Sequence, residues 1–276
     1  MTKCKPFVKW AGGKRQILEK LLESAPDKFN KYYEPFIGGG ALFFELCPKS
    51  AVINDYNSEL MNVYMVLLNK DKFNNLCNTL DEFEKKHDEN FYYSIRNLDR
   101  NKVTFETMPD YYRAARTIYM NKAGFNGLYR VNAKNEFNVP FGKKVKLNTY
   151  ERDNLKNIHD YLSSIDIEIL SEDFESSVKS ANRNDFIYFD PPYDTDKDGF
   201  IGYTQNGFGK DEQRRLAEVY KNLADKGCYV MLSNHNTALI QELYAAFNIR
   251  VITARRNINS VGTKRGPVEE VIITNY

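Results

Sequence analysis

Short apolar runs alternate with helical patterns along most of the chain, and this alternation restricts the fold more than any other feature of the sequence. Apolar residues recur at helical spacing in 58–69, 211–225 and 237–247. Strands that alternate with helices form parallel sheets. The sequence therefore predicts an α/β fold with one sheet of about seven strands. The predicted strands are 32–36, 51–55, 166–170, 186–190, 228–233, 249–254 and 270–275.

The middle of the chain interrupts this alternation. A charged stretch and a helical pattern at 110–121 are followed by two alternating runs, 127–131 and 137–141, with a polar turn between them. Two such runs joined by a turn are typical of a β-hairpin. We therefore expect an inserted, mostly helical domain that carries a hairpin at 76–146, and a main domain formed by 1–75 and 147–276.

Composition excludes several classes of protein. Of the 276 residues, 42% are hydrophobic and 28% are charged, as in globular rather than disordered chains. No apolar run approaches the roughly 18 residues of a membrane-spanning helix, and the first residues lack a secretory signal. We therefore expect a cytoplasmic protein without a membrane partner. The four cysteines and three histidines are scattered rather than clustered, so we expect no metal and no disulfide.

Positive charge is concentrated in two stretches, although the net charge is only +2. Residues 113–156 contain ten basic and three acidic side chains, and 250–266 contain five basic and no acidic ones. The first stretch is also rich in Tyr, Phe and Asn, which can stack on bases and bond to their edges. A solvated surface accounts for such charge equally well, so charge alone leaves nucleic-acid binding open.

The segment Asp190-Pro191-Pro192-Tyr193 follows an apolar predicted strand. Each proline fixes φ and removes an N–H group, so the corner is expected to be rigid. It would hold the Asp190 carboxylate and the Pro191 carbonyl beside the ring of Tyr193. This arrangement suits a flat ring with an exocyclic amino group, which can stack on Tyr193 and donate its two N–H bonds to the two oxygens. An ordinary proline turn at the end of a strand is the alternative.

Three acidic or glycine-rich turns at predicted strand ends indicate a second ligand. Gly38 begins a run of three glycines, where backbone can approach a ligand closely, but the spacing differs from the dinucleotide pattern G-x-G-x-x-G. Asp55 ends the next strand, where α/β folds bond a ribose hydroxyl. Asp173 and Phe174 follow the third strand and could hold the edge and cover the face of an adenine. These features favour a cationic, nucleoside-like cofactor, although both acids could instead cap turns.

Five motifs occur in an order that resembles the Dam-type DNA adenine-N6 methyltransferases. They are Phe7-Val-Lys-Trp-Ala-Gly-Gly-Lys14, Glu34-Pro-Phe-Ile-Gly-Gly-Gly40, Asn54-Asp55, the hairpin segments 125–130 and 137–142, and Asp190-Pro-Pro-Tyr193. The resemblance extends from Phe7 to the end of the chain. It implies a Rossmann-like methyltransferase sheet with an antiparallel last strand, and it makes 76–146 a target-recognition domain. The implied reaction moves a methyl group from S-adenosylmethionine to N6 of adenine in double-stranded DNA, within G-A-T-C and by base flipping.

The resemblance also assigns residues to three groups. The flipped adenine would contact Asp190, Pro191 and Tyr193. The cofactor would contact Trp10, Lys14, Phe36, Gly38, Asp55, Asp173 and Phe174. In the DNA, Phe125 would be the wedge in the base stack, Asn126, Leu128, Arg130 and Pro140 would recognise the site, and Lys9 would contact its first guanine.

Several alternatives to these assignments remain. Trp10, Phe36, Phe125 and Phe174 could be core residues, Lys9 and Lys14 surface cations, and Arg130 a salt-bridge partner. Related enzymes commonly carry Tyr at the wedge, so Phe125 lacks a hydroxyl that could bond to DNA. We expect double-stranded DNA as the partner, no metal, and a monomer or weak dimer.

Other functions fit parts of the sequence. Asp-Pro-Pro-Tyr suits any planar amino group, so RNA adenine or a protein glutamine could be the substrate. A catalytically silent DNA-binding protein could retain the fold, but it has no need of Asp190 or Asp55. A nicotinamide oxidoreductase is disfavoured because the glycine pattern of dinucleotide-binding folds is missing.

Overall fold

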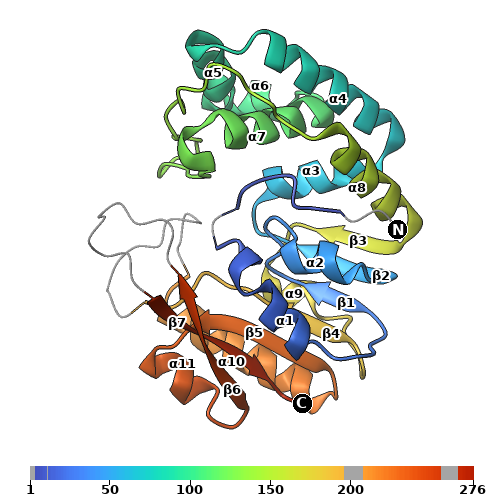
Figure 1. Ribbon diagram of the computed structural model, residues 1–276, viewed down its shortest axis with the longest axis vertical. Helices are drawn as coiled ribbons and strands as arrows, with labels where there is room; N and C mark the ends of the chain where they lie inside the picture. The colour runs from blue at the N-terminus through green and yellow to red at the C-terminus, as the bar shows by residue number, and fades with distance from the viewer. Residues whose placement is uncertain (1–3, 11, 196–207, 256–266) are drawn as a thin grey trace. The chain divides into compact units, whose positions relative to one another are not determined.

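The computed structural model describes residues 4–10, 12–195, 208–255 and 267–276, and the chain divides into two compact units (Figure 1). The first unit comprises Met1–Gly13, Gly38–Cys47 and Asp55–Ser171, and the second comprises Lys14–Ile37, Pro48–Asn54 and Glu172–Tyr276. Residues 76–146 lie within the first unit. Their separate role as a recognition domain stays a prediction.

The described residues form a mixed sheet of seven strands in the order β3-β2-β1-β4-β5-β7-β6. The strands are β1 (Tyr32–Glu34), β2 (Ser50–Asn54), β3 (Asp166–Leu170), β4 (Phe186–Phe189), β5 (Tyr229–His235), β6 (Asn248–Arg255) and β7 (Pro267–Thr274). β1 pairs in parallel with β2 and β4, and β4 pairs in parallel with β5. β7 is antiparallel to both β5 and β6. The predicted α/β fold is confirmed, and the antiparallel β7 confirms the antiparallel last strand that the resemblance implies.

The central strands of the second unit determine where site residues emerge. All residues of β1 and β4 are buried. Burial explains the continuous apolar sequence of β4, whereas β1 ends in the buried Glu34, which accepts a hydrogen bond from the Tyr32 hydroxyl at 2.8 Å. Tyr32 is in register with both Ala51 and Phe186. Because parallel strands end at the same edge of a sheet, the segments that follow β1 and β4 begin along one edge, where α/β folds bind ligands.

The first unit is mainly helical. Its helices are α2 (Ala41–Leu46), α3 (Ser58–Leu68), α4 (Lys70–Lys85), α5 (Glu89–Arg96), η2 (Asn97–Arg100), α6 (Lys102–Glu106), α7 (Asp110–Ala123), η3 (Phe125–Gly127) and α8 (Arg152–Ser164). Both α3 and α4 pack against α7. The buried Arg116 of α7 forms a 2.7 Å ion pair with Asp99 and donates to the Ile95 carbonyl, so it joins α7 to α5 and η2.

The predicted hairpin is present only in part. Its arms meet at two antiparallel bridges, Gly124 with Phe141 and Val131 with Phe137, and form no regular strands. Two features interrupt the ladder: Pro140 has no N–H group to donate, and Asn126 adopts a left-handed conformation with φ of 56°. The prediction of an antiparallel turn is therefore right, whereas the prediction of two strands is wrong.

The second unit contains η1 (Lys14–Gln16), α1 (Leu18–Ser24), α9 (Phe174–Ser177), α10 (Lys210–Asp225) and α11 (Ala238–Leu243). α10 packs on β5. α11 is shorter than the predicted 237–247. It begins after Thr237, whose hydroxyl accepts the Ile240 N–H at 3.3 Å, and it ends at Leu243. Most of the basic stretch 250–266 lies outside the described residues. Among those described, no helix combines the length and the apolar composition needed to cross a bilayer.

Candidate functional site

Asp190 follows the buried strand β4 and carries a partly compensated charge. Its Oδ1 lies 2.6 Å from Lys14 Nζ and accepts a 3.0 Å hydrogen bond from Ser233 Oγ. The side chains of Lys14 and Asp190 are 8% and 18% exposed. Burial raises the pKa of Asp190, while the Lys14 ammonium and the Ser233 hydroxyl oppose this shift. Asp190 is therefore held as a desolvated carboxyl group beside one cation.

Tyr193 lies beside the same cation. Lys14 Nζ is 4.4 Å from the centre of the Tyr193 ring, and the Tyr193 hydroxyl donates to Glu270 at 3.3 Å. The ring of His235 meets that of Tyr193 edge-on at 4.8 Å. Lys14, which the sequence assigns to the cofactor, is thus found in this structure with Asp190 and Tyr193. The corner accommodates a nitrogen donor that bonds to the carboxylate and lies against the ring.

Two buried amides support the proline corner. Gln213 of α10 donates to the Pro192 carbonyl at 2.9 Å, and Asn234 of β5 donates to Gln213 at 3.1 Å. Asn234 also accepts the Asp194 N–H at 2.8 Å. Both amide side chains are fully buried. Sequence analysis missed these residues and Ser233. The signal was the pair Ser233-Asn234 at the end of an apolar strand.

The glycine turn of the first unit brings Trp10, Gly38 and Asp55 together. Gly38 has a φ of +48°, and a Cβ atom there would lie 2.8 Å from Trp10 Cδ1, so only glycine fits against the indole. Asp55 accepts N–H bonds from Gly38 at 3.1 Å and Asn57 at 2.9 Å. Burial nevertheless raises the pKa of Asp55 to about 6. Asp55 does cap a turn, and it remains a candidate hydroxyl acceptor.

Phe36, Asp173 and Phe174 come together in the second unit. The rings of Phe36 and Phe174 are 5.5 Å apart, and Phe208 lies 5.7 Å and 5.9 Å from them. Asp173 caps α9 by accepting the Glu175 N–H at 3.0 Å. Phe174 is only 4% exposed, so it contributes to an aromatic core in this structure. The assigned contact with an adenine stays a prediction.

The predicted DNA-contacting residues surround one turn of the first unit. Phe125 is 50% exposed, and its N–H donates to the Pro140 carbonyl at 2.9 Å. Asn126 and Pro140 are exposed, and Leu128 is half-buried. Arg130 is exposed and donates to the Asn138 side chain at 2.7 Å, an amide rather than the acid expected of a salt bridge. These side chains are therefore available on a surface that the interrupted hairpin organises.

Asn121, which sequence analysis missed, joins Lys9 to this turn. Its side chain accepts the Lys9 N–H at 2.9 Å and donates to the carbonyls of Lys9 at 2.7 Å and Gly127 at 3.0 Å. Asn121 is 2% exposed. The amide fixes the backbone of Lys9 against the turn while the Lys9 side chain stays at the surface. Thus the six residues assigned to DNA lie in one part of the first unit.

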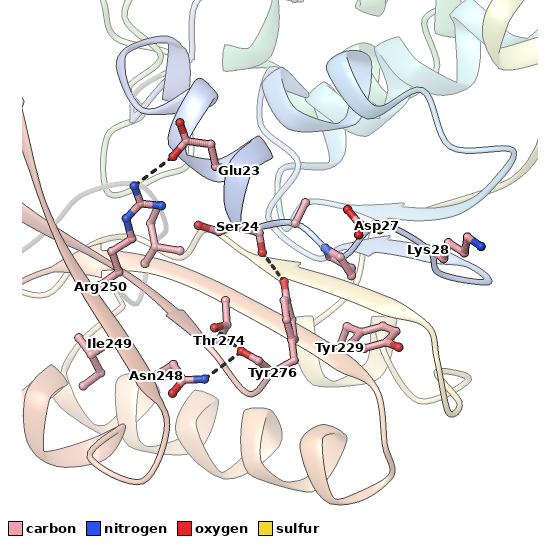
Figure 2. Close-up of a pocket in the computed structure, with 13 residues that line it drawn as sticks. Glu23, Ser24, Asp27, Lys28, Tyr229, Asn248, Ile249, Arg250, Thr274 and Tyr276 are labelled. Carbon is pink, nitrogen blue, oxygen red and sulfur yellow. Dashed lines mark hydrogen bonds and ion pairs between the residues drawn. The ribbon is translucent and has the colours of Figure 1, made fainter.

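The described residues include a groove but no metal site. No group of three or more His, Cys, Asp or Glu side chains could hold a metal ion there. An open groove of about 830 Å³ lies between the end of α1 and strands β6 and β7 (Figure 2). Several of its polar groups contact one another: Arg250 pairs with Glu23 at 3.0 Å, and the Tyr276 hydroxyl donates to the Ser24 carbonyl at 2.7 Å (Figure 2). It contains none of the residues assigned above.

An α/β sheet with a glycine turn after β1 and an Asp-Pro-Pro-Tyr corner after β4 is typical of enzymes that methylate amino groups. The family model described as D12 class N6 adenine-specific DNA methyltransferase matches residues 10–258. The chain belongs to this family and is an adenine-specific DNA methyltransferase. The resemblance inferred from the five motifs is confirmed.

Named relatives align along nearly the whole chain. The type II methyltransferase M1.LlaDCHI of Lactococcus lactis subsp. cremoris is 44% identical over 274 residues, which cover 99% of this chain and 95% of the relative. The type II methyltransferase M.MjaIII of Methanocaldococcus jannaschii is 40% identical over 292 residues, covering 99% of both. The DNA adenine methylase of Escherichia coli K12 is 30% identical over 275 residues, covering 99% and 95%.

Proposed function

We propose that this enzyme transfers the methyl group of S-adenosylmethionine to N6 of an adenine that has been flipped out of double-stranded DNA, within G-A-T-C. The observation that supports this most is the corner at the end of β4. There the Lys14 nitrogen bonds to Asp190 at 2.6 Å and lies 4.4 Å from the Tyr193 ring centre. An exocyclic amino group whose ring stacks on Tyr193 requires the same pair of contacts.

The target base enters this corner in place of the Lys14 ammonium. Extrusion of a base from a duplex costs a few kcal/mol, and stacking on an aromatic side chain returns about 1–3 kcal/mol per base. Asp190 and the Pro191 carbonyl accept the two N6 hydrogens, which withdraws the nitrogen lone pair from the ring. Positioning of this kind can supply a large part of a rate enhancement. Once displaced from Asp190, Lys14 is available to the carboxylate of the cofactor.

Asp190 then removes a proton from the methylated nitrogen. A free aspartic acid is a poor base because its pKa is about 3.9. Burial raises the pKa of Asp190, so its carboxylate accepts a proton more readily than a solvated one. The proton leaves after the nitrogen has gained its methyl group, because the neutral aromatic amine is far too weak an acid for this base.

The cofactor residues fit S-adenosylmethionine by their chemistry. Asp55 and Asp173 offer carboxylates to hydroxyl and amino groups, and Trp10, Phe36 and Phe174 offer apolar surface to a nucleoside. Gly38 provides the close backbone approach that its +48° φ allows. When bound, the cofactor supplies an electrophilic methyl group on a sulfonium ion, whose positive charge suits acidic surroundings.

The surface around Phe125 binds the duplex in this proposal. Phe125 is half exposed and fills the gap that the flipped base leaves. Asn126, Leu128, Arg130 and Pro140 contact base edges, and Lys9 contacts the first guanine. An Arg that bonds to guanine O6 and N7 provides about 1–3 kcal/mol of discrimination. Residues 76–146 form the target-recognition domain, and the enzyme acts in the cytoplasm as a monomer or weak dimer.

Transfer of labelled methyl groups tests this proposal. Purified protein is incubated with methyl-labelled S-adenosylmethionine and duplexes that differ at each position of G-A-T-C, and the product nucleoside is identified by mass spectrometry. We expect N6-methyladenine in the G-A-T-C duplex and a strong loss when any of the four positions is changed. Asp190→Ala should abolish incorporation, whereas Asp211→Ala, at a fully exposed acid of the same unit, should not.

Three results would contradict parts of the proposal. Label incorporated by Asp190→Ala would refute the catalytic corner. Equal labelling of duplexes with altered sites would refute the G-A-T-C preference. Preferential labelling of an RNA of the same sequence would favour RNA as the substrate.

A further inference from the structure

Arg215 of α10 is bound to both residues assigned to the adenine end of the cofactor. Its Nη1 and Nη2 atoms donate to Oδ1 and Oδ2 of Asp173 at 2.8 Å and 2.7 Å. This is the two-pronged geometry that fixes a carboxylate most strongly. The same guanidinium lies over the Phe174 ring, with Cζ 4.1 Å from the ring centre. No motif in the sequence marked Arg215.

Two further acids hold the guanidinium in place. Arg215 Nη2 is 2.6 Å from Glu212 and Nη1 is 3.1 Å from Glu175. These contacts raise the pKa of Arg215 and lower that of Asp173, chiefly through the bonds between the two. Arg215 therefore stays charged, and so does Asp173. With three carboxylates around one guanidinium, the cluster keeps a net negative charge.

The bonds to Asp173 leave room for a ligand. A carboxylate has about four acceptor positions on its two oxygens. In the described part of the chain, Oδ1 accepts from Arg215 and from the Glu175 N–H, while Oδ2 accepts from Arg215. One position on Oδ2 is left by these bonds, and the guanidinium fixes its direction. A single donor such as an amino or hydroxyl group matches that position.

We propose that Arg215 is a positioning residue for the cofactor, which orients the Asp173 carboxylate and the Phe174 ring for the nucleoside part of S-adenosylmethionine. This inference rests on the proposed role of Asp173 and Phe174 in cofactor binding. Arg215 does not touch the reacting atoms, so it governs cofactor affinity rather than the rate at saturation. If Arg215 served only to join α9 to α10, its replacement would instead lower the stability of the protein and leave the affinity for the cofactor unchanged.

Calorimetric titration of the full-length protein tests the proposal. S-adenosylmethionine and S-adenosylhomocysteine are titrated into wild type, Arg215→Gln, Arg215→Lys and the control Arg214→Gln. Arg214 is the neighbouring arginine, and it makes an exposed 3.3 Å contact with Asp211. We expect Kd to rise about tenfold or more for both ligands in Arg215→Gln. The rise should be smaller in Arg215→Lys, which keeps the charge but loses the two-pronged geometry. Kd should not change in Arg214→Gln.

The two ligands separate positioning from simple charge. S-adenosylhomocysteine lacks the sulfonium charge but keeps the nucleoside. If Arg215 acted only as a positive charge, its removal would strengthen binding of S-adenosylmethionine relative to S-adenosylhomocysteine. Positioning predicts an equal loss for both, together with a raised KM for the cofactor and a kcat that changes by less than about twofold. Unchanged affinity, or tighter binding of S-adenosylmethionine, overturns the proposal.

The variant Asp173→Asn distinguishes failure of this inference from failure of the proposed function. If Asp173→Asn binds both ligands like wild type, the cofactor role of Asp173 is wrong. If Asp173→Asn binds weakly while Arg215→Gln does not, only the inference about Arg215 is wrong. The double variant Asp173→Asn/Arg215→Gln should lose less affinity than the sum of the two single losses, because Arg215 acts in part through Asp173, and a fully additive loss contradicts this. Should Arg215→Gln unfold, Arg215→Lys and the double variant provide the same comparison.

Discussion

Replacement of Lys14 by Met tests how strongly the corner at Asp190 depends on one cation. Lys14→Met keeps much of the side-chain volume and removes the charge that lies 2.6 Å from Asp190. A second pair in the chain serves as a control, because Lys72 and Asp110 are also 2.6 Å apart but 46% and 47% exposed. The two pairs share a distance and differ in burial, so the comparison isolates the effect of desolvation.

The expected losses of stability differ severalfold. Removal of one partner from a buried pair costs about 3–5 kcal/mol because a desolvated charge is left behind. Since Asp190 keeps 18% of its side-chain exposure, we expect about 3 kcal/mol for Lys14→Met, at the low end of that range. Removal of one partner from an exposed pair costs about 0–1 kcal/mol, so Lys72→Met should lose little. Addition of Asp190→Asn to Lys14→Met should restore part of the loss.

The effect on pH dependence has a definite sign. Lys14 opposes the rise that burial imposes on the pKa of Asp190, so this pKa rises further without Lys14, because a nearby cation favours the ionised carboxylate. The acidic limb of the methyl-transfer rate should therefore move to higher pH. A carboxyl with a higher pKa in the folded than in the unfolded protein binds protons more tightly when folded. The stability deficit of Lys14→Met should accordingly be largest near neutral pH and shrink as the pH falls through the folded pKa.

Chemical denaturation followed by circular dichroism, at several pH values, measures the free energies of unfolding. Initial rates of methyl transfer over the same pH range measure the position of the acidic limb. Equal losses in Lys14→Met and Lys72→Met would refute the argument that burial makes the Lys14 pair important. An acidic limb that stays at its wild-type position would show that Lys14 does not control the ionisation of Asp190.

Three other predictions concern separate parts of the chain. Burial raises the pKa of Asp55 to about 6, so the affinity for S-adenosylmethionine, measured by calorimetry, should fall as the pH drops below about 6. Asp55→Asn should bind the cofactor about tenfold more weakly and without this pH dependence. A wild-type affinity that does not change with pH contradicts a role of ionised Asp55 in binding. Arg130→Ala should relax specificity at one base pair by about 1–3 kcal/mol in rates on single-position duplex variants, and an unchanged preference removes Arg130 from the recognition set. Asn121→Ala removes three hydrogen bonds to the backbone of Lys9 and Gly127. It should lower the free energy of unfolding by about 1–3 kcal/mol and raise the KM for DNA. A wild-type KM would mean that the contacts of Asn121 do not serve DNA binding.

The sequence by itself determined the strands and the motifs at their ends. All seven predicted strands are present, and every boundary lies within three residues of the prediction. Strand β4 was the plainest signal, because burial on both faces requires an unbroken apolar run such as Phe186–Phe189. The proline corner and the glycine turn were also recognisable, because proline and glycine act on the backbone locally. Local chemistry therefore sufficed for the fold class and for the tetrapeptide Asp190-Pro-Pro-Tyr193, which we propose is catalytic.

Only the tertiary structure decided which side chains meet. Lys14 forms an ion pair with Asp190, Arg215 forms one with Asp173, and Asn121 is hydrogen-bonded to Lys9, although each pair is far apart in the sequence. Lys14 stands in a different motif from Asp190, so its pairing with Asp190 was not visible in the sequence. Arg215 and Asn121 stand in no motif, and a lone Arg or Asn looks like an ordinary polar residue. The prediction of two hairpin strands was wrong for a related reason. Alternation of apolar and polar residues implies a continuous ladder of hydrogen bonds, which Pro140 and the left-handed Asn126 interrupt. Contacts across long separations depend on how whole elements pack, and that packing is a property of the folded chain rather than of any window of residues.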